Sequence, residues 1–97
     1  MRVVFRPEAD AGLVAAVAYY GKIEEALAER FLQDMKRLVG ELSAHPKTFR
    51  LFDPPARRHF SFTFPFAVIY LEQEDHLWIV ALMHMKREPG YWKERLG

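Results

Sequence analysis

Residues 66–84, FAVIYLEQEDHLWIVALMH, decide the fold of this chain. Two almost wholly apolar runs, Phe66 to Glu72 and Leu77 to His84, flank a short polar segment at Gln73 to His76. Apolar runs of this length without polar alternation are typical of strands inside a sheet, with both faces covered. The polar segment has the length of a hairpin connection. We therefore predict two neighbouring strands at the centre of a sheet.

A third strand is predicted immediately upstream, over residues 58–64, because apolar and polar residues alternate there. Four side chains would share one face of this strand: Arg58, Phe60, Phe62 and Phe64. The opposite face would carry His59, Ser61 and Thr63. The alternation predicts one mostly aromatic face.

The chain begins with another predicted strand and a helix. Arg2 to Arg6 is rich in β-branched and aromatic residues and ends at Pro7, which favours a strand followed by a helix start. Glu8 to Tyr20 is rich in alanine and has acidic residues in its first turn, where the helix dipole favours them. We predict that this helix ends at Gly21.

A second helix gives the clearest periodic signal in the chain. Apolar residues recur at steps of three or four and would form one buried stripe: Ile23, Leu27, Phe31, Met35, Leu38 and Leu42. The helix is predicted to end at His45-Pro46, because proline cannot continue the hydrogen-bond ladder. Strand, two helices and three strands predict an α+β fold, in which a helix hairpin packs on one face of a small, mainly antiparallel sheet.

Composition limits what such a chain can be. Its 97 residues allow one domain, spanning 1–97, and 51% hydrophobic residues are enough to build a core. The absence of Cys excludes disulfides and thiolate chemistry. We see no secretion signal or membrane-spanning run and expect a cytoplasmic protein.

The formal net charge of +1 gives no general attraction to nucleic acid, but it results from cancellation. Segments 1–7, 45–60 and 84–97 are net positive, whereas 8–44 and 61–83 are net negative. The fold could bring the positive segments together on one surface. We therefore expect a basic surface that faces a partner.

Several motifs accompany this order of elements: Tyr19-Tyr20, Phe31, His45-Pro46, the segment from Phe64 to Tyr70, and the run HMKREPGYWKER at residues 84–95. Together they resemble the RelE/ParE superfamily of toxins from type II toxin–antitoxin modules. The last run is the most specific, because it is similar to the His, Arg, Pro, Tyr-Trp and Arg signature common in ParE-like members.

The resemblance implies a toxin that arrests growth and is neutralised by a cognate antitoxin. RelE-like members cleave mRNA in the ribosomal A site, whereas ParE-like members poison DNA gyrase. A small sheet flanked by only two helices also leaves one face and at least one edge strand partly bare, and such edges attract an added strand or an amphipathic helix.

The ribonuclease hypothesis has its own candidate residues. Cleavage through the RNA 2′-hydroxyl needs a base, cations for the developing charge, and an acid. By resemblance to RelE-like sites, these roles fall to Arg58, His84, Arg87 and Tyr91. Two further basic positions of such sites are replaced here by Phe60 and Ala67. Since each lost donor costs about 2.7–4 kcal/mol in comparable sites, we favour a toxin that binds a protein target.

Candidate residues for binding the target or the antitoxin are Arg57, Arg58, Arg87, Tyr91, Trp92 and Arg95. Each candidate also has an ordinary structural explanation. The arginines could be solvated charges, and the rings of Tyr91 and Trp92 could cover a sheet edge. His84 could be a hydrogen-bonded residue at the end of a strand. No cofactor is expected, and the spacing of the histidines predicts no metal site. A third hypothesis is a non-toxic homologue that binds the antitoxin and helps to repress its operon.

Overall fold

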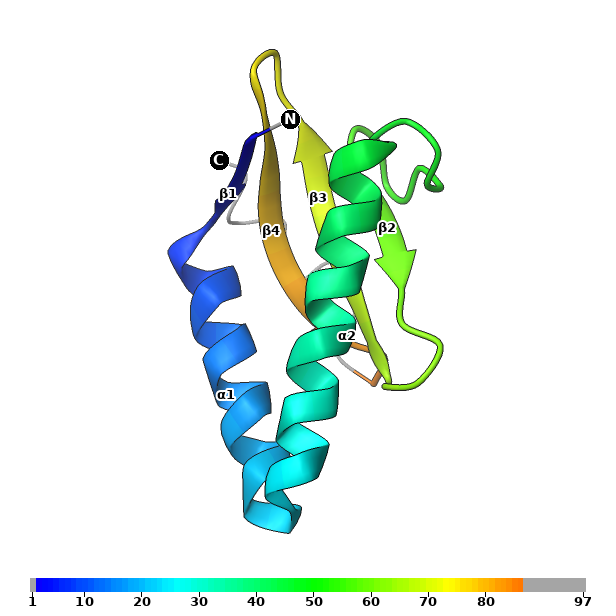
Figure 1. Ribbon diagram of the computed structural model, residues 1–97. Helices are drawn as coiled ribbons and strands as arrows, with labels where there is room; N and C mark the ends of the chain where they lie inside the picture. The colour runs from blue at the N-terminus through cyan, green and yellow to red at the C-terminus, as the bar shows by residue number, and fades with distance from the viewer. Residues whose placement is uncertain (1, 87–97) are drawn as a thin grey trace.

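The predicted hairpin forms the centre of the sheet in the computed structural model, which describes residues 2–86 (Figure 1). Strands β3 (Phe66–Glu72) and β4 (His76–His84) pair in antiparallel fashion, and the Gln73 amide donates to the His76 carbonyl at 2.8 Å. The strand order is β1-β4-β3-β2. Both central strands are almost wholly buried, which confirms the interpretation of their apolar runs.

The two edge strands complete a mainly antiparallel sheet. β1 (Arg2–Phe5) lies parallel to β4, and β2 (Arg57–Phe60) lies antiparallel to β3. The two helices connect β1 to the later strands, so that the first strand of the chain lies at the edge opposite β2. The α+β fold predicted from the sequence is confirmed.

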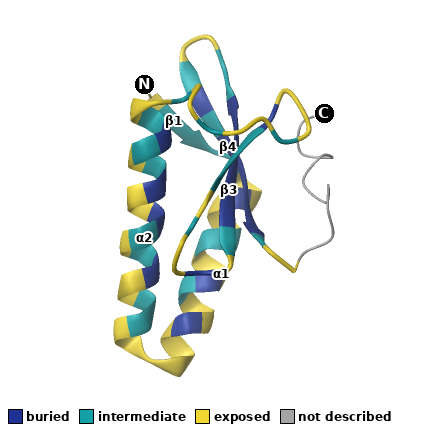
Figure 2. Cartoon of the chain, turned by 90° about the vertical axis from the view of Figure 1, so that its right-hand side faces the viewer, coloured by how far each residue is buried: buried dark blue, intermediate teal, exposed yellow. Residues whose placement is uncertain are grey.

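Both helices cover the same face of the sheet. α1 (Pro7–Ile23) begins with Pro7 in its first turn, and α2 (Glu25–Ala44) is followed by His45 and Pro46 as predicted. The buried side of α2 is turned toward the sheet (Figure 2). Among the described residues, no helix combines the length and the apolar character needed to cross a membrane.

The predicted end of the first helix at Gly21 is wrong. α1 continues to Ile23, and the break comes at Glu24, which has an extended backbone and donates its amide to the Tyr20 carbonyl at 3.0 Å. A glycine inside a helix costs only about 1 kcal/mol, which tertiary packing can offset. Because the break follows Ile23, this side chain leaves the predicted stripe and is 61% exposed.

The predicted strand over residues 58–64 is too long. β2 ends at Phe60, and the Ser61 hydroxyl accepts hydrogen bonds from the amides of Thr63 and Phe64, which form a turn. Phe64 is buried, whereas Phe62 is 92% exposed. The side chains of this segment therefore do not form the single aromatic face that the alternation predicted.

A β-bulge sets which side chains of β4 meet the helices. Ile69 pairs with Ala81 but Tyr70 pairs with Ile79, so Val80 is an extra residue opposite β3. The helix side of the sheet carries Val68, Tyr70, Leu77, Ile79 and Leu82. The opposite side, called here the outer face, carries Ala67, Ile69, Leu71, Trp78, Val80, Ala81 and Met83, together with Ala56 and Phe52 from the loop before β2.

We predict that Phe31→Ala lowers the free energy of unfolding by about 3–5 kcal/mol, because it removes a fully buried ring from the helix–sheet core. Urea unfolding of the purified protein measures the change. Phe62→Ala is the matched control and should change stability by about 0.5 kcal/mol or less. Equal losses in the two variants would contradict the described packing.

Candidate functional site

The Arg58 side chain lies on the outer face of the sheet and packs against two aromatic rings. Its guanidinium carbon lies 4.0 Å from the ring centroid of Phe52 and 4.5 Å from that of Phe60. The Nε–H is buried and has no hydrogen-bond partner. Burial, followed by the nearby charge of Arg50, lowers the pKa of Arg58. The outer face thus holds a partly desolvated cation.

Phe60 and Ala67, the two positions where the resemblance to RelE-like sites implies replaced basic residues, are neighbours of Arg58. Phe60 pairs with Ala67, one step along the same face from the pair of Arg58 with Ile69. On strands β2 to β4, between residues 57 and 84, Arg58 is the one Arg or Lys side chain on the outer face, and most of its neighbours there are apolar. The loop before β2 brings the charge of Arg50 close to it. The direct side-chain contacts of the Arg58 guanidinium are therefore cation–π contacts with Phe52 and Phe60.

Arg6 contributes a second cation at the opposite edge of the sheet, which the sequence analysis missed. Its guanidinium lies 5.0 Å from the ring centroid of Trp78 and 3.1 Å from the Glu8 carboxylate. Its Nε–H is also buried without a hydrogen-bond partner. The outer face is thus flanked by Arg6 and Arg58, each held against aromatic rings.

Arg57 points to the helix side of the sheet. It pairs with Tyr70, and its Nη1 donates to the Phe49 carbonyl at 2.8 Å. This contact ties the loop after α2 to strand β2. Arg57 therefore does not join Arg58 on one surface, although the two residues are adjacent in sequence.

His84 also lies on the helix side, at the end of β4. Its ring centroid is 5.0 Å from that of Phe66, and its Nδ1 accepts a hydrogen bond from the Lys86 amide at 3.1 Å. It borders a hollow of about 460 Å³ with Tyr19, Tyr20 and Phe66. His84 and Arg58 are on opposite faces of the sheet, so the structure does not bring these two candidate catalytic groups together.

Four candidate residues fall outside the described residues: Arg87, Tyr91, Trp92 and Arg95. Within residues 2–86, no three His, Asp or Glu side chains are grouped so that they could hold a metal ion.

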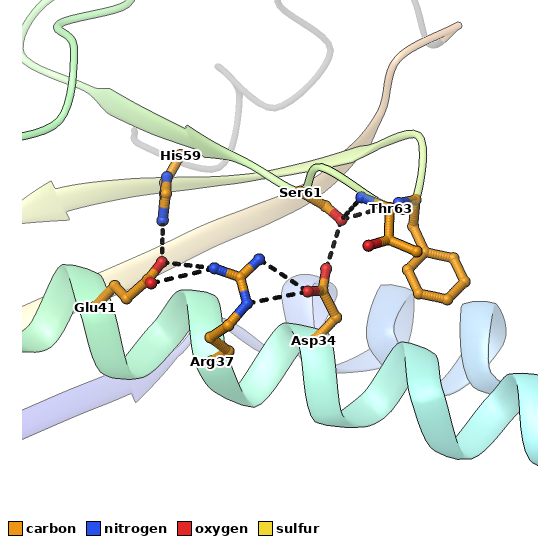
Figure 3. A network of polar contacts seen from close by, with 7 residues as sticks. Asp34, Arg37, Glu41, His59, Ser61 and Thr63 are labelled. Atoms are coloured by element: carbon orange, nitrogen blue, oxygen red, sulfur yellow. Dashed lines mark hydrogen bonds and ion pairs between the residues drawn. The ribbon is translucent and has the colours of Figure 1, made fainter.

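A polar network joins α2 to β2 and the turn that follows it (Figure 3). Arg37 bonds both Asp34, at 2.8 Å, and Glu41, at 2.9 Å. Glu41 also contacts His59 Nε2 at 2.7 Å, and Asp34 accepts a hydrogen bond from the Ser61 hydroxyl. The network fixes the position of the turn relative to the helix.

The charges of this network depend on one another. Burial opposes the ionisation of Asp34, but hydrogen bonds from Ser61 and Arg37 outweigh it and lower the pKa of Asp34. The hydrogen bond from His59 is the main reason that the pKa of Glu41 is lowered. The spacing of Asp34, Arg37 and Glu41 by three and four residues is a sequence signal for the helical part of this network, but nothing local predicts its partners on β2.

An apolar groove of about 460 Å³ lies between the helices and the sheet. Its floor is formed by Val68 and Leu82, and its walls by β1 and the two helices, including Phe5, Leu13 and Val39. A groove lined in this way suits the apolar side of an amphipathic segment.

We predict that acid destabilises the fold through Asp34 and Glu41. Because both pKa values are lower in the folded chain than in the unfolded chain, their stabilising effect is present above the unfolded values. The free energy of unfolding should fall between about pH 5 and pH 3 as these groups take up protons. Urea unfolding at several pH values measures this, and Asp34→Asn should reduce the slope.

The control for this prediction is Asp10→Asn, which changes a carboxylate of α1 outside the network. It should leave the slope closer to that of the unchanged chain. If Asp34→Asn and Asp10→Asn behave alike, the network does not hold the turn as described.

Comparison with known proteins adds two findings. The family described as the ParE toxin of the type II toxin–antitoxin system parDE matches residues 3–89. A solved chain of the chromosomal ParDE TA system from P. aeruginosa has the same fold, with a TM-score of 0.77 and 20% identity over 89% of this chain and 97% of that chain. Among curated proteins, none matches.

Proposed function

Because this chain belongs to the ParE toxin family of type II toxin–antitoxin systems, we propose that it arrests growth by binding a protein target such as DNA gyrase. The observation that carries the proposal is the outer face of the sheet. There, the Arg58 guanidinium packs against the rings of Phe52 and Phe60, and apolar side chains cover the neighbouring part of the face. An RNA-cleaving site needs several groups around one phosphate, and this face supports a surface for protein contact instead.

The position of His84 supports the same proposal. A general acid or base must come within hydrogen-bond reach of the reacting atoms, together with the cations that stabilise them. His84 and Arg58 lie on opposite faces of the sheet, so one phosphate could not contact both. The ribosome-dependent endoribonuclease is therefore the weaker hypothesis.

We predict that the purified protein inhibits supercoiling by gyrase in a concentration-dependent way, because a target-binding toxin acts without nucleic-acid chemistry. A supercoiling assay with relaxed plasmid measures the inhibition. Primer extension on translated mRNA after induction is the companion assay and should show no new cuts.

These two assays, together with growth after induction, separate the alternatives. Unchanged supercoiling together with cuts in mRNA would replace the gyrase proposal by the ribonuclease hypothesis. Normal growth after induction without antitoxin would favour the non-toxic homologue with a regulatory role.

The apolar groove supports a place for the cognate antitoxin. Its lining comes from α1, α2, β1 and the centre of the sheet, so an amphipathic helix placed there would contact every layer of the fold. A partner that binds only the folded chain stabilises it by mass action. We propose that an antitoxin helix occupies this groove.

We predict that the cognate antitoxin raises the melting temperature of the purified chain. At a concentration one hundred times Kd, the added stability is about 2.7 kcal/mol. Val39→Asp, in the wall of the groove, should abolish most of this rise, whereas Val14→Asp on the exposed side of α1 should preserve it. Thermal melts with and without the antitoxin measure the rise. An equal rise in melting temperature for both variants would mean that the antitoxin binds outside this groove.

A further inference from the structure

Phe62, in the turn between β2 and β3, is the most exposed large apolar side chain among the described residues, with 92% of its surface accessible. Single exposed apolar side chains are common and need no explanation by themselves. What distinguishes Phe62 is that the chain around it is fixed in place on both sides.

The turn is held by bonds from both of its flanks. The Ser61 hydroxyl accepts from the Thr63 amide at 3.1 Å and from the Phe64 amide at 2.9 Å, and it donates to Asp34 of α2. The Phe64 ring packs against Tyr20 and Phe31, with both centroid distances at 5.1 Å. Phe62 is therefore presented outward by a turn that is attached to α2 and to the core.

Such an arrangement lowers the cost of binding. A ring on a flexible loop loses conformational entropy when it enters a pocket, whereas a ring on a fixed turn has already lost most of it. Interfaces place their strongest contacts on a few large side chains that fill pockets of the partner. The geometry of this turn matches that role.

The surface beside the turn indicates the kind of partner. A hollow of about 620 Å³ between the turn and α2 is lined by acidic, basic and apolar side chains, including Glu29, Arg30, Asp34, Arg37 and Phe64. Nucleic acid would need an excess of cations facing its phosphates, and Glu29 and Asp34 oppose that. An aromatic anchor with polar and charged groups around it matches the apolar centre and polar rim of a protein interface.

We propose that Phe62 is the anchor through which this chain docks on the protein that it inhibits, with its ring in an apolar pocket of a folded partner. Exposed Glu29 and Arg30 would pair with charges at the rim of that pocket. The inhibited protein is favoured over the antitoxin because the apolar groove, on another side of α2, already suits an amphipathic segment. The inference rests on the proposed function, since it assumes a protein target.

The test compares the unchanged chain with Phe62→Ser and with Val14→Ser, which removes an apolar side chain of 62% exposure from α1. Both substitutions are on the surface, so melting temperatures should stay close to that of the unchanged chain. In the gyrase supercoiling assay, Phe62→Ser should inhibit about tenfold more weakly or worse, whereas Val14→Ser should inhibit like the unchanged chain.

The outcomes separate this inference from the proposed function. If the unchanged chain and Phe62→Ser inhibit gyrase equally, the anchor is overturned and the gyrase target stands. If the unchanged chain does not inhibit gyrase, gyrase is rejected as the target. The role of Phe62 is then tested by measuring growth after induction of each variant. Loss of arrest in Phe62→Ser alone then supports an anchor for another target, whereas retained arrest, or no arrest by the unchanged chain, overturns it.

Discussion

An aromatic cluster joins the helices to the sheet, and the rest of the structure depends on it. Tyr20 lies near the end of α1, Phe31 lies in the first half of α2, and Phe64 and Phe66 come from the turn and the start of β3. The ring centroids of Phe31 lie 5.0–5.2 Å from those of the other three. Since buried aromatic rings carry large apolar areas, this cluster supplies much of the contact between the two layers.

The cluster also explains why β2 is short. Phe64 contributes to it only if the chain leaves the sheet after Phe60 and turns toward the helices, where Ser61 meets Asp34. The same path points Phe62 away from the protein. A buried side chain and an exposed one, two residues apart, thus follow from one packing requirement. Strict alternation along a strand would have given both the same environment.

This difference marks the limit of prediction from the sequence. The apolar runs of β3 and β4 and the stripe of α2 were predictable, because burial of a whole strand or helix face leaves a long, regular pattern. The true ends of α1 and β2, which were predicted at Gly21 and Phe64, were not predictable, because long-range contacts determine where these elements end. The bulge at Val80 was equally hidden, since a continuous apolar run contains no polar residue that reveals a change of face.

The candidate site was predictable to a similar degree. The resemblance to RelE-like sites predicted that Phe60 and Ala67 stand at positions that are basic in such sites, and the register places both residues beside Arg58. Two contacts could not be foreseen. Arg6 meets Trp78 because the bulge turns Trp78 to the outer face, and His59 meets Glu41 across elements 18 residues apart. Contacts of this kind depend on the three-dimensional register, which spacing along the chain does not encode.

Helix α2 links the two surfaces on which the proposals rest. Its side toward α1 forms a wall of the apolar groove, and another side faces the turn that carries Phe62. Leu32 borders both hollows. An antitoxin in the groove and a target at the turn would therefore contact the same helix on different sides. Neutralisation would then need either a collision between the two partners or a shift of α2 that the polar network passes on to the turn.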